Sequence, residues 1–286
     1  MLQLNDWMTT PLVTVPQDTH LDVCARLMAR DGIRHLPVVS TGGRLRGMVY
    51  DVSLFTLSVM SVPEDTMPTP PTPEEARLPA FFVAVPPDII AGVSAPLLSV
   101  IRRLADSRDD AVVAIDREQR PVGIFTEHDV VTRAAEHLRP GITTEWTRER
   151  RLITVQSEQP LSTALAKMKA ARVRHLLVYE GEVFVGVLSY RDLAFGNIPS
   201  EDPARPGRAV GELVRVAPIT APVGTSLRDV ARVMQEQIIG CVPILADGRV
   251  VRVITRSDIS RALAVSLEDE VFFDSADLLR LSPMLD

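Results

Sequence analysis

The chain has 286 residues, of which 46% are hydrophobic and 24% are charged. This composition is apolar enough to bury a substantial core, which excludes a wholly disordered protein, and the length predicts about two domains. The formal net charge of −6, with no long basic run to offset it, argues against a dedicated nucleic-acid-binding protein.

The cysteines and the apolar runs exclude further classes of protein. Cys24 and Cys241 cannot make a disulfide framework or a multi-cysteine zinc site. Residues 1–10 include Asp6 and lack the basic and apolar parts of a signal peptide. Every apolar run is interrupted well short of the roughly 18 residues that a membrane span needs. We therefore expect a cytoplasmic protein that makes no contact with membranes.

Four stretches of the chain show the same order of predicted elements. Short β-type runs lie at 13–15, 90–92, 153–155 and 219–221, the second being the least regular. Each is followed by a helix that is apolar on one face. The apolar positions are Leu21, Cys24, Leu27 and Met28; Leu98, Ile101 and Leu104; Leu161, Ala164, Leu165 and Met168; and Leu227, Val230, Ala231 and Met234.

A β-hairpin and a second helix complete each unit. The first hairpin spans Leu36–Tyr50 and turns at Gly42 and Gly43. Because a unit of about 60 residues buries little surface alone, we expect the units to pair. The proline-rich segment 63–79 predicts an extended linker between the first two units.

Two sequence blocks recur in register within these units. The first is Arg-His before an apolar strand, at 34–35 and 174–175; the second and fourth units have Asp110-Ala111 and Gly240-Cys241 there. The second block is a glycine, two apolar residues, Ser or Thr, and Asp three positions later. Its members are Gly123, Thr126 and Asp129; Gly186, Ser189 and Asp192; Arg252, Thr255 and Asp258; and, in altered form, Gly47, Tyr50 and Ser53.

Each block has a structural and a functional interpretation. Ser or Thr followed by Asp three residues later is a helix-capping box. The glycine permits either a strand bulge or a close backbone approach, and Arg252 either blocks a cleft or offers charge to a phosphate. Arg-His supplies several N–H donors that suit phosphate oxygens, although such residues are often only structural. His128 and Arg191 are further phosphate candidates, or part of a solvated helix face.

The in-register recurrence of both blocks resembles the cystathionine-β-synthase-type (CBS) domain, present four times. This resemblance implies an α/β (α+β) fold of four strand–helix–strand–strand–helix units. The units pair through their sheets into two Bateman modules that form a disc, an architecture similar to that of the γ subunits of AMP-activated protein kinases. We expect repeats at 1–60, 81–138, 139–198 and 199–266, a linker at 61–80 and a C-terminal tail at 267–286 that packs on the disc as a helix or docks a partner.

The resemblance also implies adenine-nucleotide sites between paired repeats, with no prosthetic group or metal. The Asp would accept hydrogen bonds from the ribose hydroxyls, the lead-in strand would meet the adenine edge, and Arg-His would face phosphates. The implied site residues are Arg34, His35, Gly123, Thr126, Asp129, Ile153, Thr154, Val155, Arg174, His175, Gly186, Ser189, Arg191, Asp192, Thr255 and Asp258. The first repeat lacks the carboxylate, so we expect its site to be empty or altered, while Arg252 leaves the fourth undecided.

We expect a regulatory protein rather than an enzyme, because the chain contains no Walker-type, GxGxxG or HExxH motif. The alternatives are a scaffold without ligand, the regulatory subunit of a separate enzyme, or a sensor of S-adenosylmethionine or a cyclic dinucleotide. Expected partners are a small-molecule nucleotide, a second copy of the chain and an effector protein.

Overall fold

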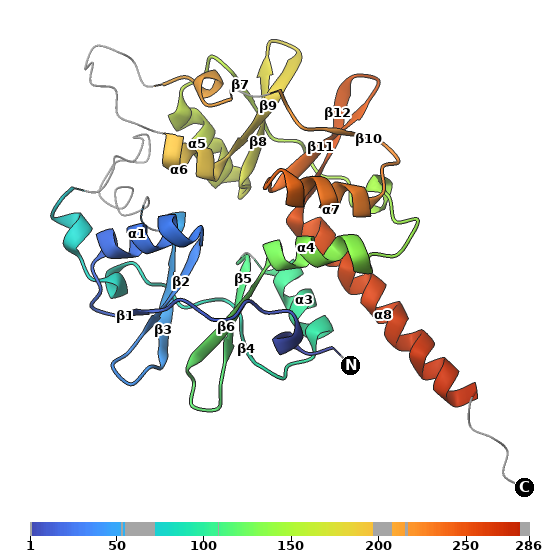
Figure 1. Ribbon diagram of the computed structural model, residues 1–286. Helices are drawn as coiled ribbons and strands as arrows, with labels where there is room; N and C mark the ends of the chain where they lie inside the picture. Colours follow the sequence, from blue (N-terminus) through green and yellow to red (C-terminus); the bar gives the residue numbers. More distant parts are fainter. Residues whose placement is uncertain are drawn as a thin grey trace, which may run out of the picture.

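The computed structural model describes residues 2–52, 54, 72–107, 109–196, 208–214 and 217–280, which form four units of one design (Figure 1). The first unit contains the 3-10 helix η1 (Leu4–Asp6), β1 (Val15–Pro16), α1 (Leu21–Asp31), β2 (His35–Val39) and β3 (Leu45–Tyr50). The second contains η2 (Glu75–Arg77), η3 (Ala80–Phe82), β4 (Ile90–Gly92), α3 (Leu97–Asp106), β5 (Ala111–Ile115), β6 (Pro121–Thr126) and α4 (Glu127–His137). The third contains η4 (Thr144–Trp146), β7 (Thr154–Gln156), α5 (Leu161–Ala171), β8 (His175–Glu180), β9 (Val183–Ser189) and α6 (Tyr190–Gly196). The fourth contains η5 (Val210–Glu212), β10 (Ala221–Pro222), α7 (Leu227–Glu236), β11 (Cys241–Ala246), β12 (Arg249–Thr255) and α8 (Arg256–Arg280).

The first helix of each unit buries the face that its periodicity predicts. All four expected positions of α5 and of α7 are buried. In α3 the buried stripe includes Leu97 and Val100, and Leu98 is only partly buried. Residues 97, 100, 101 and 104 lie on one side of a 3.6-residue helix, so the apolar stripe begins one residue earlier than we expected.

Each unit has a three-stranded sheet in which the lead-in strand pairs in parallel and the hairpin pairs antiparallel. The irregular run at Ile90–Gly92 is the lead-in strand β4, as expected. All four hairpins have a register shift at the same place, one residue beyond the pairs Val38–Gly47, Ala114–Gly123, Val178–Gly186 and Ile244–Arg252. The recurring glycine position therefore adjoins a β-bulge, where the strand bends.

The segment that precedes each lead-in strand docks on another unit rather than on its own. The backbone N–H groups of Leu4 and Asn5 donate to carbonyls of the second unit, and those of Ala80 and Phe81 donate to carbonyls of the first. The third and fourth units exchange segments in the same way. The backbone N–H of Thr144, from the third unit, donates to a carbonyl of the fourth, and those of Val210 and Gly211, from the fourth unit, donate to carbonyls of the third. Each unit thus completes its partner, which explains why a single unit is not expected to fold alone.

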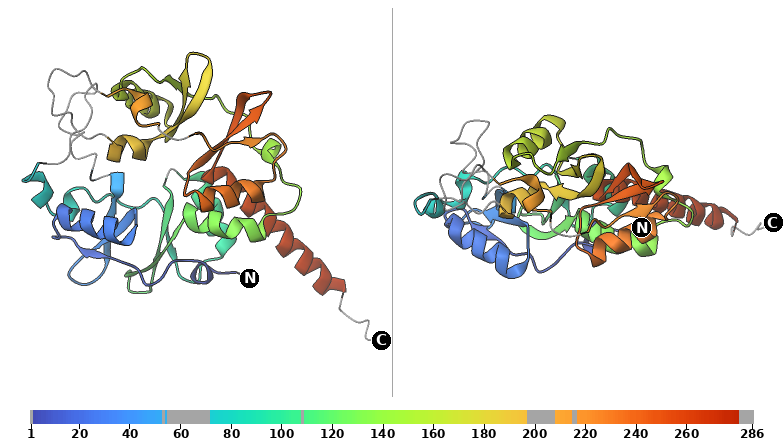
Figure 2. Two further views of the ribbon diagram at one scale, coloured as in Figure 1. Left: turned by 45° about the horizontal axis from the view of Figure 1, so that its top comes forward. Right: turned by 90° about the horizontal axis from the view of Figure 1, so that it is seen from above.

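Helices join the two pairs of units into a flattened disc (Figures 1 and 2). Helices α3 and α4 of the second unit pack against α7 and α8 of the fourth, and one continuous apolar core contains side chains from both. Two smaller cores lie in the first and third units, and each also contains a buried residue of the exchanged segment, Ala80 in the first and Val210 in the third. The expected architecture of four units in two modules is confirmed.

The proline-rich segment 63–79, expected to be an extended linker, lies partly within the described residues. Residues 63–71 are outside the described residues, but residues 72–79 are not an extended linker. Glu75–Arg77 forms η2, which contacts α1, and Pro79 bridges to His20.

At the other end of the chain, α8 continues from the fourth unit to Arg280 and projects beyond the disc (Figure 1), whereas Leu267 is still buried in the core.

We predict that Gly186→Ala lowers the free energy of unfolding by about 1–3 kcal/mol, the usual cost of overpacking. A Cβ atom at this position would overlap Cγ1 of Val214, on the segment contributed by the fourth unit. Valine is stiff at χ1 and has little room to turn aside. Urea unfolding measures the effect. Gly92→Ala is the matched control, because a Cβ there meets nothing within 4 Å; equal stability changes in both variants would contradict the proposed overlap.

Candidate functional site

Thr126–Asp129 and Ser189–Asp192 are capping boxes, as their spacing indicates, whereas Thr255–Asp258 makes the half of the box in which the Asp carboxylate is the acceptor. In each, one carboxylate oxygen accepts hydrogen bonds from the backbone N–H and the hydroxyl of the Ser or Thr three residues earlier, at 2.6–2.9 Å. The pairs are Thr126–Asp129, Ser189–Asp192 and Thr255–Asp258. One oxygen of each carboxylate, Oδ2, is thus used within the chain in all three units, and any ligand would have to use the second oxygen, Oδ1.

The three Oδ1 atoms have different surroundings. Thr9 Oγ1 donates to Asp129 Oδ1 at 3.1 Å. Arg150 Nη2 donates to Asp258 Oδ1 at 2.6 Å, and that carboxylate is almost completely buried. Asp192 is exposed, and its Oδ1 has no partner within the part of the chain that the structure describes. The third unit therefore presents the carboxylate that is most open to a ligand.

The first unit has no equivalent carboxylate at the capping position. Tyr50 occupies the place of Ser or Thr, and its hydroxyl donates to Asp109 of the second unit at 2.7 Å. Burial, followed by the hydrogen bond to Asp109, raises the pKa of Tyr50 far above its ordinary value. Ser53, in the place of Asp, lies outside the described residues.

The recurring glycines make room for the exchanged segments. A Cβ on Gly123 would lie 2.5 Å from Sδ of Met8, and one on Gly47 would lie 3.0 Å from Cβ of Ala84. In the fourth unit Arg252 Nη1 donates to the carbonyl oxygens of Thr144, Glu145 and Thr147. Arg252 thus binds the backbone of the exchanged segment, an arrangement that neither of our two interpretations anticipated.

The lead-in strand of the third unit already uses its backbone acceptors inside the chain. The carbonyl of Ile153 accepts from the N–H of Leu177, and that of Thr154 accepts from Lys167 Nζ at 2.9 Å. Val155 is buried in the core of this unit. An adenine edge at this strand would therefore have to meet other backbone groups or the exposed side chain of Thr154.

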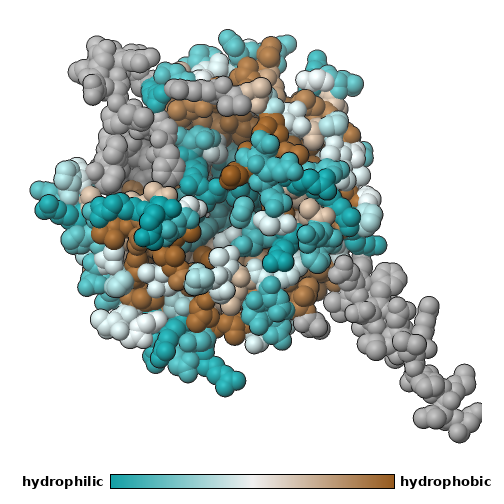
Figure 3. Space-filling model, in the orientation of Figure 1, coloured by the Kyte–Doolittle hydropathy of each residue, from teal (hydrophilic) through white to brown (hydrophobic). Residues whose placement is uncertain are grey.

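The helix that follows the hairpin of each unit begins near the centre of the disc (Figure 1). The first strand of each hairpin begins there as well. In the view of Figure 3, hydrophilic residues gather around this centre. His35 Nε2 lies 2.6 Å from Asp110 Oδ1, and Arg174 Nη1 lies 2.8 Å from Asp110 Oδ2. Arg174 Nη2 and Ser257 Oγ contact the two oxygens of Glu127, at 3.1 and 2.5 Å. This network joins residues of all four units, and we call it the central network.

The central network changes the roles expected of His35 and Arg174. Both bind Asp110, so neither is a free phosphate donor in this state. Although burial acts in the opposite direction, His35 and Arg174 hold the pKa of Asp110 well below its ordinary value. Asp110 occupies, in the second unit, the position that Arg34 and Arg174 occupy in the first and third. The opposite charges at matched positions were the sequence signal for this pairing, and our sequence analysis missed it.

A second group at the centre, Arg34, Arg191 and Arg256, is cationic, and we call it the cation cluster. Burial, followed by the nearby Arg191 and Arg256, lowers the pKa of Arg34 to about 10. The Arg34 guanidinium has no hydrogen bond or ion pair within the described residues, and buried Nε of Arg256 likewise lacks a hydrogen-bond partner there. Arg191 Nη2 lies 3.4 Å from Asp51. A buried donor without a partner is unusual in proteins, and together with the partly buried guanidinium of Arg34 it fits an anion-binding site.

The two other histidines near this cluster are not expected to be cations. Burial, followed by the charges of Arg174, Arg256 and Arg34, lowers the pKa of His175 to about 3. Burial and Arg256 also lower the pKa of His128. His175 is therefore neutral at pH 7 and can offer a phosphate one N–H donor but no charge.

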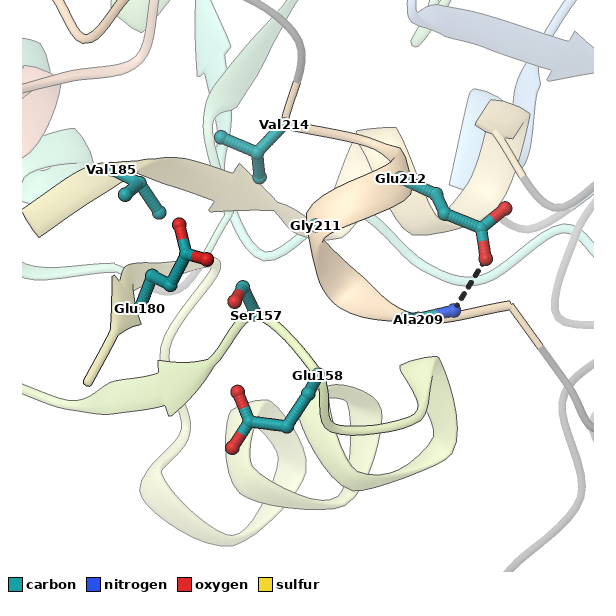
Figure 4. Close-up of a pocket in the computed structure, with 8 residues that line it drawn as sticks. All are labelled: Ser157, Glu158, Glu180, Val185, Ala209, Gly211, Glu212 and Val214. Atoms are coloured by element: carbon teal, nitrogen blue, oxygen red, sulfur yellow. Dashed lines mark hydrogen bonds between the residues drawn. The ribbon is translucent and has the colours of Figure 1, made fainter.

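A shallow depression of about 370 Å³ lies elsewhere, between the third unit and η5 (Figure 4). It includes Glu158, Glu180 and Glu212, and Glu212 accepts a hydrogen bond from the N–H of Ala209 at 3.0 Å. None of the site residues predicted from the sequence lines it. Three carboxylates make it unsuitable for an anionic nucleotide. Among the described residues, no group of His, Cys, Asp or Glu could hold a metal ion, and no helix is long and apolar enough to cross a membrane.

Comparisons with known proteins agree with this architecture. The CBS domain model matches residues 4–60, 82–136, 148–195 and 210–265. The uncharacterized protein MJ1404 of Methanocaldococcus jannaschii is 26% identical over 270 residues, covering 90% of this chain, and the chain spans 61% of that protein's length. An uncharacterized 33.4 kDa protein of Thermofilum pendens is 24% identical, covering 93% of this chain and 92% of its own.

Two crystal structures share the fold over most of the chain. Protein MJ1225 of M. jannaschii, described as an archaeal homologue of g-AMPK, has a TM-score of 0.73 and 17% identity, covering 91% of this chain and 99% of its own. A conserved protein of Pyrococcus horikoshii has a TM-score of 0.65 and 20% identity, covering 92% of this chain and 100% of its own. At these identities the likeness shows the fold alone. Since the family model matches most of the sequence in four copies, the chain belongs to the CBS domain family.

Proposed function

We propose that this protein is a non-enzymatic regulatory protein that binds an adenine nucleotide such as AMP in the cleft of the third repeat. In this proposal the ribose hydroxyls donate to Asp192 and the phosphate lies against the cation cluster. The observation that carries it is the exposed Oδ1 of Asp192, which has no partner within the described residues.

The position of Asp192 supports the proposal that the phosphate lies against the cation cluster. Asp192 follows Arg191 of the cation cluster directly. The pKa of Cys241, the first residue of β11, is raised mainly by burial, is lowered by Arg256 and is raised further by Asp192, so both charges lie near this residue. The carboxylate is therefore near the centre of the disc. In this proposal the phosphate of the nucleotide binds Arg34 and Nε of Arg256, which have no hydrogen-bond partner among the described residues, and such charge-assisted bonds are strong.

Regulation requires an output outside the binding site. We infer that the output is altered binding of a separate effector protein or altered association of two copies of the chain. A neutral or cationic adenosine ligand, such as S-adenosylmethionine, is the alternative, and it would make no use of the cation cluster.

Calorimetric titration of AMP into the Asp192→Ala variant tests the proposed site. We expect the affinity to fall about 10- to 150-fold, because a hydrogen bond to a charged group contributes about 1.5–3 kcal/mol. The variant should also be slightly less stable, since it loses a capping box.

Asp229→Ala is the matched control for this experiment. Asp229 accepts a hydrogen bond from Ser226 Oγ at 2.6 Å in the capping position of α7, and none of the proposed binding residues contacts it. This variant should lose similar stability and keep its affinity for AMP. If Asp192→Ala also kept its affinity while folded, Asp192 would be a capping residue only and the proposed site would be wrong.

A further inference from the structure

The segment of residues 144–150, contributed by the third repeat, is held on the fourth repeat by Arg252. Arg252 Nη1 donates to the carbonyls of Thr144 and Glu145 at 3.2 and 3.1 Å, and to both oxygens of Thr147. Repeats one to three have glycine at this position and therefore have no side chain that could bind the exchanged segment. The fourth repeat alone has an arginine that fixes this segment through several hydrogen bonds.

The same segment ends with Arg150 on the carboxylate of the fourth repeat. Arg150 Nη2 lies 2.6 Å from Asp258 Oδ1, and Arg261 Nη1 approaches the same oxygen at 3.5 Å. Asp258 Oδ2 accepts from the N–H and hydroxyl of Thr255. Both oxygens of a carboxylate that is 3% exposed are therefore used within the chain.

In the part of the chain that the structure describes, the other two carboxylates have no charged partner. Asp129 Oδ1 accepts only the neutral hydroxyl of Thr9, and Asp192 Oδ1 is exposed without a partner among the described residues. A ribose hydroxyl can replace another hydroxyl at little cost. It is a much weaker partner for a buried carboxylate than a guanidinium, which brings a full charge.

We infer that Arg150 is a specificity-determining residue that excludes nucleotides from the fourth repeat by occupying the carboxylate that would bind the ribose. This inference rests on the proposed function, because it assumes that an exposed carboxylate at this position of the repeat binds ribose. Arg252 is a positioning residue in this arrangement, since it fixes the segment that carries Arg150. The third and fourth repeats, although paired, are therefore not equivalent in binding.

The test is the number of AMP molecules that the full chain binds, measured by calorimetric titration and equilibrium dialysis. We expect Arg150→Gln to bind one more equivalent of AMP per chain than the unaltered protein. The double variant Arg150→Gln/Asp258→Asn should lose that extra equivalent. Arg148→Gln is the matched control, because Arg148 is an exposed residue of the same segment with no contact to Asp258. Arg150→Ala, which removes the charge and the donors, provides a second variant if the first does not fold.

The outcomes separate this inference from the proposed function. An unchanged number of bound AMP molecules in folded Arg150→Gln or Arg150→Ala would overturn the inference, even if Asp192→Ala abolished binding as proposed. Loss of one equivalent from the single variant Asp258→Asn would also overturn it, because the fourth site would then already be open. If AMP bound only after Arg150 was replaced, the inference would stand and the proposed site at Asp192 would fall. Binding to none of these proteins would overturn both.

Discussion

The Asp110→Ala variant is expected to unfold with a free energy about 3–5 kcal/mol lower than that of the unaltered protein at pH 7. Asp110 is the member of the central network that binds both His35 and Arg174, at 2.6 and 2.8 Å, and its side chain is only 21% exposed. Removing one partner of a buried ionic group leaves the others without compensation, and losses of this size are usual. Urea unfolding measures the difference.

The pH dependence of this difference provides a stricter test. The pKa of Asp110 is lowered in the folded protein, so its stabilising effect is complete above the unfolded-state pKa of about 3.9. The effect is lost as the pH falls toward the folded-state pKa, because protonation removes the charge that His35 and Arg174 bind. The stability difference between the two proteins should shrink as the pH falls below about 4.

Asp18→Ala is the control for this prediction. Asp18 is exposed and has no hydrogen bond or ion pair within the described residues, so its replacement should change the free energy of unfolding by no more than about 0.5 kcal/mol. An Asp110→Ala variant that was as stable as this control would show that the central network does not hold the four repeats together.

Arg34→Gln is expected to weaken AMP binding about 10- to 150-fold without lowering the stability of the protein. The affinity should fall because a charge-assisted hydrogen bond to the phosphate is lost, worth about 1.5–3 kcal/mol. The stability should be unchanged or slightly higher, because Arg34 lies near two other arginines and forms no ion pair within the described residues. The pKa of Arg34 is lowered to about 10 in the folded protein, so the charged side chain destabilises the folded state at neutral pH. This destabilisation disappears only as the pH rises above about 10.

Comparison of AMP with adenosine makes this prediction specific for the phosphate. AMP binding to the unaltered protein should weaken steeply with salt, whereas adenosine should bind weakly and with little salt dependence. Arg34→Gln should reduce the difference between the two ligands. Arg46→Gln, on the exposed side of the same hairpin, should leave AMP binding unchanged. Equal binding of adenosine and AMP at low salt would exclude a phosphate role for the cation cluster and favour a neutral or cationic adenosine ligand.

Much of the fold could be predicted from the sequence because the relevant interactions are local. The apolar face of α5 and α7 follows from residues three and four positions apart, and each capping box joins residues three positions apart. The hairpins follow from short apolar runs separated by turn residues. Repetition in four copies made these local signals reliable, and together they indicated the family, the fold and the three aspartates.

The chemistry at the centre of the disc could not be predicted in this way. Arg174 and His175 were expected to act together on phosphates, yet Arg174 binds Asp110 and Glu127, whereas His175 is kept neutral by burial and by the surrounding arginines. Arg252 was expected to face a cleft or a phosphate, and it binds the backbone of an exchanged segment instead. Arg150 attracted no attention in the sequence because it belongs to no motif.

The sequence by itself therefore determined what each repeat is, and the tertiary structure decided which of the repeated carboxylates is open. Asp129, Asp192 and Asp258 occupy the same motif, but their Oδ1 atoms differ. Thr9 binds Oδ1 of Asp129 and Arg150 binds that of Asp258, from positions 120 and 108 residues away, whereas Oδ1 of Asp192 has no partner among the described residues. These partners arrive on segments exchanged between paired repeats, and their positions depend on how whole repeats pack. Coulomb interactions and burial act through space regardless of distance along the chain, so identical motifs acquire different chemistry once the four repeats assemble.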